Sequence, residues 1–171
     1  MINLAVIGLG TWGQRHVRSA RFSERFNVIA AADPDTERAS LVAEKLDLKL
    51  APSLDEVLSN TDIDAVTLAT PHTLHTKQIV QAAIAGKHVY TEKPLALNVQ
   101  DAHRSILAAK NGGIELVLGH DQRHCPVIVD LKNMIDDGNF GNILHIETNL
   151  SHGSIQRLYK EALENTDAPL Q

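Results

Sequence analysis

Short apolar runs alternate with longer segments of helical periodicity along the chain as far as residue 118. The runs are continuous, as expected of strands that are buried on both faces of a parallel sheet. The predicted strands are residues 3–7, 27–33, 48–51, 64–69, 87–90 and 114–118. The predicted helices between them are residues 12–25, 35–46, 53–58, 73–85 and 99–110. Strands and helices in this order predict an α/β fold, a doubly wound parallel sheet with helices on both faces.

The pattern changes after the sixth predicted strand. A helix is predicted over residues 126–137, and residues 143–150 then alternate between apolar and polar side chains, as in a strand with one buried face. A last helix is predicted over residues 155–164. One strand cannot form a sheet, so residues 123–171 are predicted to begin a second α/β domain that is truncated. Its apolar face is expected to need a partner, either another copy of the chain or residues absent from it.

Composition narrows the possible partners and compartment. Hydrophobic residues make up 43% of the chain and charged residues 22%, as in soluble globular proteins. The net charge of −5 and the scattered aromatic residues argue against nucleic-acid binding. The chain lacks a signal-peptide pattern and an apolar run of the roughly 20 residues that span a bilayer, so we expect a cytoplasmic protein without a membrane partner. Cys125 is the only cysteine, and its neighbours His120 and His124 make too weak a ligand set to predict a metal site.

A glycine-rich motif follows the first predicted strand and opens the first predicted helix. It reads Gly8-Leu-Gly10-Thr11-Trp12-Gly13, a G-x-G-x-x-G pattern. The three glycines would allow the tight turn, the approach of a pyrophosphate to the backbone, and close packing of helix and strand. The helix N-terminus would offer N–H groups to the phosphates. Alternatives are a βα turn that holds no ligand, or a loop that binds a flavin or S-adenosylmethionine.

Asp33 ends the second predicted strand, twenty residues beyond Gly13. At that place a carboxylate can accept hydrogen bonds from the adenosine ribose. It would also repel a 2′-phosphate, which favours NAD over NADP, although Arg38 lies close enough to complicate this charge argument. The alternative for Asp33 is a simple turn with Pro34.

Thr70-Pro71-His72 and His75 follow the fourth predicted strand. Ligands of open α/β sheets bind beyond the carboxyl ends of strands, so Thr70, Pro71 and His75 are predicted to line the cofactor pocket. Two histidines three positions apart could instead ligate a metal, cap a helix or face solvent.

Glu92-Lys93-Pro94 follow the fifth predicted strand. Lys93 is predicted to hydrogen-bond the substrate oxygen and to stabilise alkoxide charge during hydride transfer. Glu92 would fix the lysine or contact the cofactor, and Pro94 would stiffen the turn. The alternative is a surface ion pair and a turn.

Together these motifs resemble the glucose–fructose oxidoreductase/inositol dehydrogenase family. The resemblance covers residues 2 to about 150 and rests on the glycine motif, Asp33, the segment ATPHTLH at 69–75 and the segment TEKPLALN at 91–98. It implies a Rossmann-type dinucleotide-binding domain over residues 1–122, with Lys93 at the reaction centre. Arg123 and Pro126 match a further family segment. The residues predicted to bind the cofactor are Gly8, Gly10, Thr11, Trp12, Gly13, Asp33, Thr70, Pro71, His75, Glu92 and Arg123.

The resemblance implies an NAD(P)-dependent oxidoreductase, with NAD preferred over NADP, that acts on a secondary alcohol of a sugar, cyclitol or related polyol. The family's second domain carries a glycine-rich segment with an aspartate and a histidine, and no such segment occurs in this chain. We therefore expect a fragment of an enzyme that forms a homo-oligomer at full length. Alternatives are a redox-neutral NAD-dependent glycosidase and a non-catalytic NAD-binding module.

Overall fold

The computed structural model describes residues 1–149, and its first compact unit comprises Met1–His124. All strands of this unit run parallel in one six-stranded sheet, in the order β3-β2-β1-β4-β5-β6. The strands are β1 (Ile2–Ile7), β2 (Phe26–Ala32), β3 (Lys49–Leu50), β4 (Ala65–Leu68), β5 (His88–Glu92) and β6 (Leu116–Gly119). The prediction of a doubly wound parallel sheet is confirmed.

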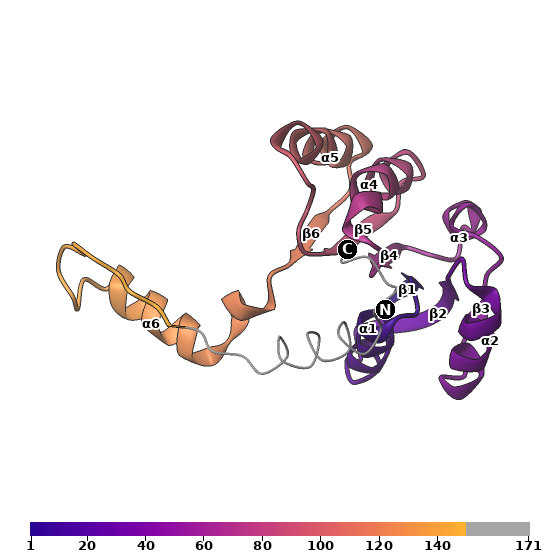
Figure 1. Ribbon diagram of the computed structural model, residues 1–171, viewed down its shortest axis with the longest axis horizontal. Helices are drawn as coiled ribbons and strands as arrows, with labels where there is room; N and C mark the ends of the chain where they lie inside the picture. Colours follow the sequence, from indigo (N-terminus) through magenta and orange to yellow (C-terminus); the bar gives the residue numbers. More distant parts are fainter. Residues whose placement is uncertain (150–171) are drawn as a thin grey trace, which may run out of the picture. The chain divides into compact units, whose positions relative to one another are not determined.

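Helices cover both faces of the sheet. They are α1 (Thr11–Arg21), α2 (Thr36–Lys45), α3 (Leu54–Ser59), α4 (His75–Ile84) and α5 (Val99–Gly112), with short 3₁₀ turns η1 (His72–Leu74) and η2 (Asp121–His124). α1 and α2 bury one apolar cluster against the sheet, and α3, α4 and α5 bury a second cluster on the other face. α4 and α5 lie side by side on that second face (Figure 1).

β1 explains why the predicted strands read as continuous apolar runs. Ala5 and Ile7 belong to the cluster under α3, α4 and α5, whereas Val6 belongs to the cluster under α1 and α2. Successive side chains of a strand point to opposite faces, so a strand covered on both faces needs an apolar residue at every position.

The predicted N-cap of α5 and the predicted glycine after α4 are confirmed, whereas the helix predicted over residues 12–25 ends at Arg21. The Asn98 side chain accepts a hydrogen bond of 2.8 Å from the backbone N–H of Asp101 and so caps the start of α5. Gly86 follows α4 with a φ of +70°, a conformation that favours glycine after a helix end. These local signals mark the end of α4 and the start of α5.

β5 is longer than predicted, because the strand continues through Glu92. The backbone of Glu92 is in register with Gly119 of β6, so pairing with the neighbouring strand extends β5 into the charged segment. Glu92 is therefore the last residue of a strand, and the turn begins at Lys93.

The second unit begins at Cys125 and contains α6 (Pro126–Asp136). The strand predicted over residues 143–150 was wrong over 143–149, which have no regular secondary structure. A strand needs a neighbour to receive its backbone hydrogen bonds, and alternation of side chains does not supply one. Leu150 and the helix predicted over residues 155–164 lie outside the described residues.

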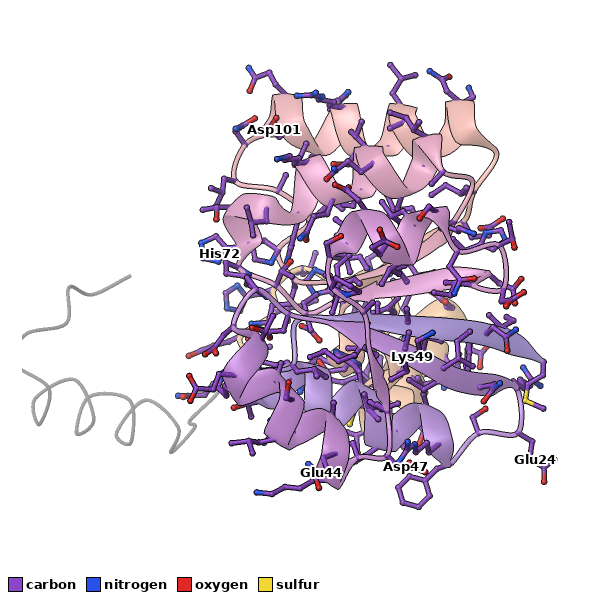
Figure 2. All side chains as sticks on the ribbon, turned by 90° about the vertical axis from the view of Figure 1, so that its right-hand side faces the viewer. Glu24, Glu44, Asp47, Lys49, His72 and Asp101 are labelled. Carbon is purple, nitrogen blue, oxygen red and sulfur yellow. The ribbon has the colours of Figure 1, made fainter. Side chains whose placement is uncertain are left out.

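The carboxyl ends of the strands gather at one edge of the sheet. Figure 2 shows His72 and Asp101, which follow β4 and β5 in the chain, at one side of the sheet, and Glu24, which precedes β2, at the opposite side. The glycine motif and the Lys93 turn follow β1 and β5 and so share the edge of His72 and Asp101. Among the residues that the structure describes, no helix has the length and apolar character needed to cross a bilayer.

Candidate functional site

Two of the three glycines of the motif are required by contacts within the protein. Gly8 has a φ of +91°, and a Cβ there would lie 2.6 Å from the carbonyl oxygen of Ala69. A Cβ on Gly13 would lie 1.7 Å from the carbonyl oxygen of Gly8, where α1 packs against the end of β1. Neither position has room for a side chain.

Gly10 differs, because no atom of residues 1–149 requires a glycine there. Its backbone is extended (φ −68°, ψ −168°), and a Cβ would meet nothing within 4 Å. Gly10 is also the N-cap of α1, and no described side chain caps this helix or places a negative charge in its first turn. A bare backbone beside free N–H groups fits the pyrophosphate of a dinucleotide.

Asp33 lies immediately after β2 and is buried against the glycine motif. Its Oδ2 accepts hydrogen bonds from the backbone N–H of Leu9 at 2.7 Å and from the Arg38 guanidinium at 2.9 Å. Its Oδ1 accepts one from the backbone N–H of Asp35 at 3.0 Å. Because a carboxylate offers about four acceptor positions, Oδ1 retains capacity for a ribose hydroxyl. Asp33 thus also holds the glycine loop in place.

Arg38 is a member of this site that the sequence placed only nearby. Besides its bond to Asp33, it donates to the carbonyl oxygen of Leu9 at 3.0 Å. The hydrogen bond to Asp33, more than the charge of Asp33 or the contacts of Asp35, raises the pKa of Arg38 above its usual value. The guanidinium therefore offsets the negative charge by which Asp33 would repel a 2′-phosphate.

A cleft of about 650 Å³ joins these groups at the carboxyl edge of β1, β2 and β4. Its lining includes Gly8, Gly10, Asp33, Arg38, Thr70 and Pro71. The Thr70 hydroxyl donates to the Gln78 side chain, which also lines the cleft and was not predicted from the sequence. The cleft is large enough for part of a dinucleotide.

His75 lies behind the wall of the cleft instead of in its lining. The side chain is buried, with Nδ1 2.8 Å from the carbonyl oxygen of Pro94 and Nε2 3.0 Å from that of Thr70. Both ring nitrogens are therefore occupied within the protein. The structure gives His75 contacts with two loops of the site and none with the open cleft.

The Lys93 turn follows β5, and its flanking residues are held on both sides. Glu92 Oε1 lies 2.7 Å from His16 Nε2 of α1, a residue that the sequence analysis missed. Lys93 itself is exposed and takes part in none of the ion pairs found among residues 1–149. An exposed ammonium on a fixed turn is free to contact a substrate.

The remaining predicted residues lie on the surface around this edge. Thr11 and Trp12 begin α1, and the exposed Trp12 ring stacks under the Arg15 guanidinium at 4.7 Å. Arg123 is exposed in η2, which follows β6, and it does not line the cleft. The cleft therefore brings Gly8, Gly10, Asp33, Thr70 and Pro71 together, and its lining does not include Thr11, Trp12, Gly13 or Arg123.

Residues 2–120 match the oxidoreductase family with an NAD-binding Rossmann fold. The chain belongs to this family. The resemblance predicted from the sequence is thereby confirmed, and so is NAD as the cofactor. The bare Gly10 backbone and the free acceptor capacity of Asp33 fit this cofactor.

Individual relatives are similar at moderate identity. The scyllo-inositol 2-dehydrogenase (NAD+) of Bacillus subtilis is 32% identical over 146 residues, with 84% of this chain and 43% of that protein aligned. The 2,7-anhydro-N-acetylneuraminate hydratase of Mediterraneibacter gnavus is 31% identical over 144 residues, with 84% and 38% aligned. The solved scyllo-inositol dehydrogenase of Lactobacillus casei with NAD(H) and scyllo-inositol has a TM-score of 0.78 at 25% identity, over 84% and 43%. The chain spans about two fifths of the length of these relatives.

His16 could have been found from one sequence signal. It lies three residues after Gly13, so both share the face of α1 that turns toward the sheet. A polar residue on that face needs a partner, and the strand ends supply the candidates. Its partner Glu92 is 76 residues away, a separation that periodicity alone cannot bridge.

Proposed function

We propose that this chain is the cofactor-binding part of an NAD-dependent dehydrogenase that acts on a secondary alcohol of a sugar, cyclitol or related polyol. The observation that carries the proposal is the shared edge of the sheet, where the bare Gly10 backbone lies after β1 and the exposed Lys93 ammonium after β5. A cofactor that is anchored at Gly10 would extend along this edge toward Lys93. The names of two relatives, both inositol dehydrogenases, support the choice of substrate class.

Each residue of the edge has a distinct task in this proposal. The N-terminus of α1 would bind the pyrophosphate, and Asp33 Oδ1 would accept a hydrogen bond from the adenosine ribose. Bound NAD supplies the nicotinamide carbon that exchanges a hydride with the substrate carbon. Lys93 would donate a hydrogen bond to the oxygen on that carbon and stabilise the negative charge that grows there during reduction of a ketone.

A second candidate function is a redox-neutral reaction that uses NAD without net turnover. It is favoured by the similarity to the hydratase of Mediterraneibacter gnavus, which is named for a reaction without net oxidation. The same anchor and the same lysine would serve it, since a transient oxidation needs the same hydride transfer. The two candidates differ in whether reduced cofactor accumulates.

The deciding experiment uses the protein expressed from its natural gene and a panel of polyols and glycosides. The dehydrogenase proposal predicts stoichiometric NADH from one or more polyols and its loss in Lys93→Met, which keeps the length of the side chain without the ammonium. Cleavage or hydration of a substrate without accumulated NADH would favour the second candidate. Unchanged turnover in Lys93→Met would refute the role of the lysine in both.

A further inference from the structure

The residues on either side of Lys93 are each bonded to a histidine. His16 Nε2 donates to Glu92 Oε1 at 2.7 Å, and His75 Nδ1 lies 2.8 Å from the carbonyl oxygen of Pro94. The two histidines belong to α1 and α4, which cover opposite faces of the sheet. The turn that carries Lys93 is therefore held from both faces.

Each histidine also links the turn to a segment that follows a strand at this edge of the sheet. His16 lies on α1, the helix that opens with the glycine motif. His75 Nε2 lies 3.0 Å from the carbonyl oxygen of Thr70, a residue that lines the cleft after β4. The neighbours of Lys93 are thus connected through one histidine each to α1, which follows the glycine loop, and to the loop after β4.

The surroundings of both imidazoles favour a fixed position. His75 is 1% exposed, and its two ring nitrogens lie 2.8 Å and 3.0 Å from the carbonyl oxygens of Pro94 and Thr70. The His16 ring packs edge-on against Tyr90, with the ring centroids 5.1 Å apart. These contacts hold the His16 and His75 rings in place. Through them, His16 contacts Glu92 and His75 contacts Pro94, the two neighbours of Lys93.

We propose that His16 and His75 are positioning residues that together place Lys93 relative to bound NAD. This inference rests on the proposed function, because it assigns a task to residues around the same lysine. Lys93 has no ion pair of its own within residues 1–149, so the position of its ammonium depends on the backbone of the turn. His75 contacts the backbone of the turn at Pro94, and His16 contacts the Glu92 side chain at the start of the turn, so the turn is linked to α1 and to the loop after β4.

The test measures how strongly NAD protects Lys93 from acetylation. Each lysine of the 171-residue chain is acetylated with trace acetic anhydride, with and without saturating NAD, and quantified by peptide mass spectrometry. Exposed Lys45 and Lys110, on α2 and α5, serve as internal references. NADH binding is measured in parallel by energy transfer from Trp12, the only tryptophan.

Matched variants separate the hydrogen bonds from the bulk of the rings. His16→Phe keeps a ring against Tyr90 and loses the donor, whereas His16→Gln keeps an N–H near the position of Nε2. His75→Gln and His75→Asn keep a donor toward Thr70 and toward Pro94, respectively. His103→Asn, on the exposed side of α5, is the control.

We expect His16→Phe to lower the protection of Lys93 by about tenfold, because it loses a hydrogen bond to a carboxylate, and His75→Gln to lower it by about fivefold, because it loses a bond to a neutral carbonyl oxygen. NADH affinity should stay within about twofold in these variants, because the glycine motif is intact. His16→Gln, His75→Asn and His103→Asn should keep most of the protection. The partly exposed His16 carries the test alone if the variants of buried His75 do not fold.

Two results would contradict these proposals, and each contradicts a different one. Full protection of Lys93 in a folded His16→Phe chain would overturn the positioning role and leave the proposed function standing. No NAD protection in the wild-type chain would overturn the proposed place of Lys93, and the positioning role with it.

Discussion

Alanine should act at Gly10 mainly on cofactor binding and at Gly13 mainly on stability. At Gly10 the added methyl group meets nothing within 4 Å, and the extended backbone is open to any residue. We therefore expect Gly10→Ala to change the free energy of unfolding by less than about 1 kcal/mol, because a poorer N-cap is offset by a less flexible unfolded chain. For a protein of this size, that corresponds to less than about 4 °C in Tm.

At Gly13 the added methyl group would lie 1.7 Å from the carbonyl oxygen of Gly8, about half an ordinary contact distance. Overpacking of this kind costs about 3 kcal/mol or more, because α1 must move away from the end of β1. The corresponding fall in Tm is about 6–12 °C. Gly13→Ala should therefore be the destabilised member of the pair.

NADH affinity tests the place of Gly10 in the cofactor site. In Gly10→Ala the methyl group would occupy the space that we propose for the pyrophosphate, and each lost bond to a charged phosphate costs about 1.5–3 kcal/mol, or tenfold to a hundredfold in Kd. Energy transfer from Trp12 to NADH measures this Kd, and thermal unfolding with NADH at about 100 times the wild-type Kd should stabilise the wild-type chain by about 2.7 kcal/mol. A Gly10→Ala chain with wild-type stability and wild-type affinity would refute the assignment of this backbone to the cofactor.

Three further predictions concern single side chains. Asp33→Ala should destabilise the chain by about 1–3 kcal/mol, because the buried N–H of Leu9 loses its acceptor. The same change frees Arg38 and should shift the relative affinity from NADH toward NADPH, as measured by parallel titrations. An unchanged ratio of the NADH and NADPH dissociation constants would contradict this. Lys87→Met should destabilise the chain by about 1–3 kcal/mol without changing NADH affinity, since the ammonium only donates to two backbone carbonyl oxygens away from the cleft. Burial, followed by the charges of Glu92 and Asp121, raises the pKa of Tyr90 above 10.0, so the folded state keeps the phenol proton longer than the unfolded state does. Stability should therefore fall as pH rises above about 10, and chemical denaturation should find a smaller fall in Tyr90→Phe; equal slopes would count against this environment.

The order of strands and helices could be predicted because its signals are local. Continuous apolar runs, the cap at Asn98 and the glycine after α4 each lie within a few residues of the element that they define. The glycine motif and Asp33 are likewise read from their places at strand ends. Such signals can be read from the sequence without knowledge of the tertiary structure.

The contacts of the site could not be predicted, because they join distant segments. Whether His75 faced the cleft or the protein interior depended on how α4 packs, and the structure turns the ring toward the carbonyl oxygens of Thr70 and Pro94. Glu92 looked like part of a turn, although pairing with β6 extends the strand through it. The alternation over residues 143–149 predicted a strand, but a pattern of side chains cannot provide the neighbouring strand that its backbone requires.

The most direct measurement compares NAD with ADP-ribose as protectants of Lys93 in the unmodified 171-residue chain. Both ligands contain the adenosine and pyrophosphate that the glycine motif and Asp33 would bind, but only NAD carries the nicotinamide. If Lys93 lies at the reactive end of the cofactor, saturating NAD should slow its acetylation markedly, and saturating ADP-ribose should leave the rate near that of the free chain. Equal protection of Lys93 by both ligands, or by neither, would contradict that placement.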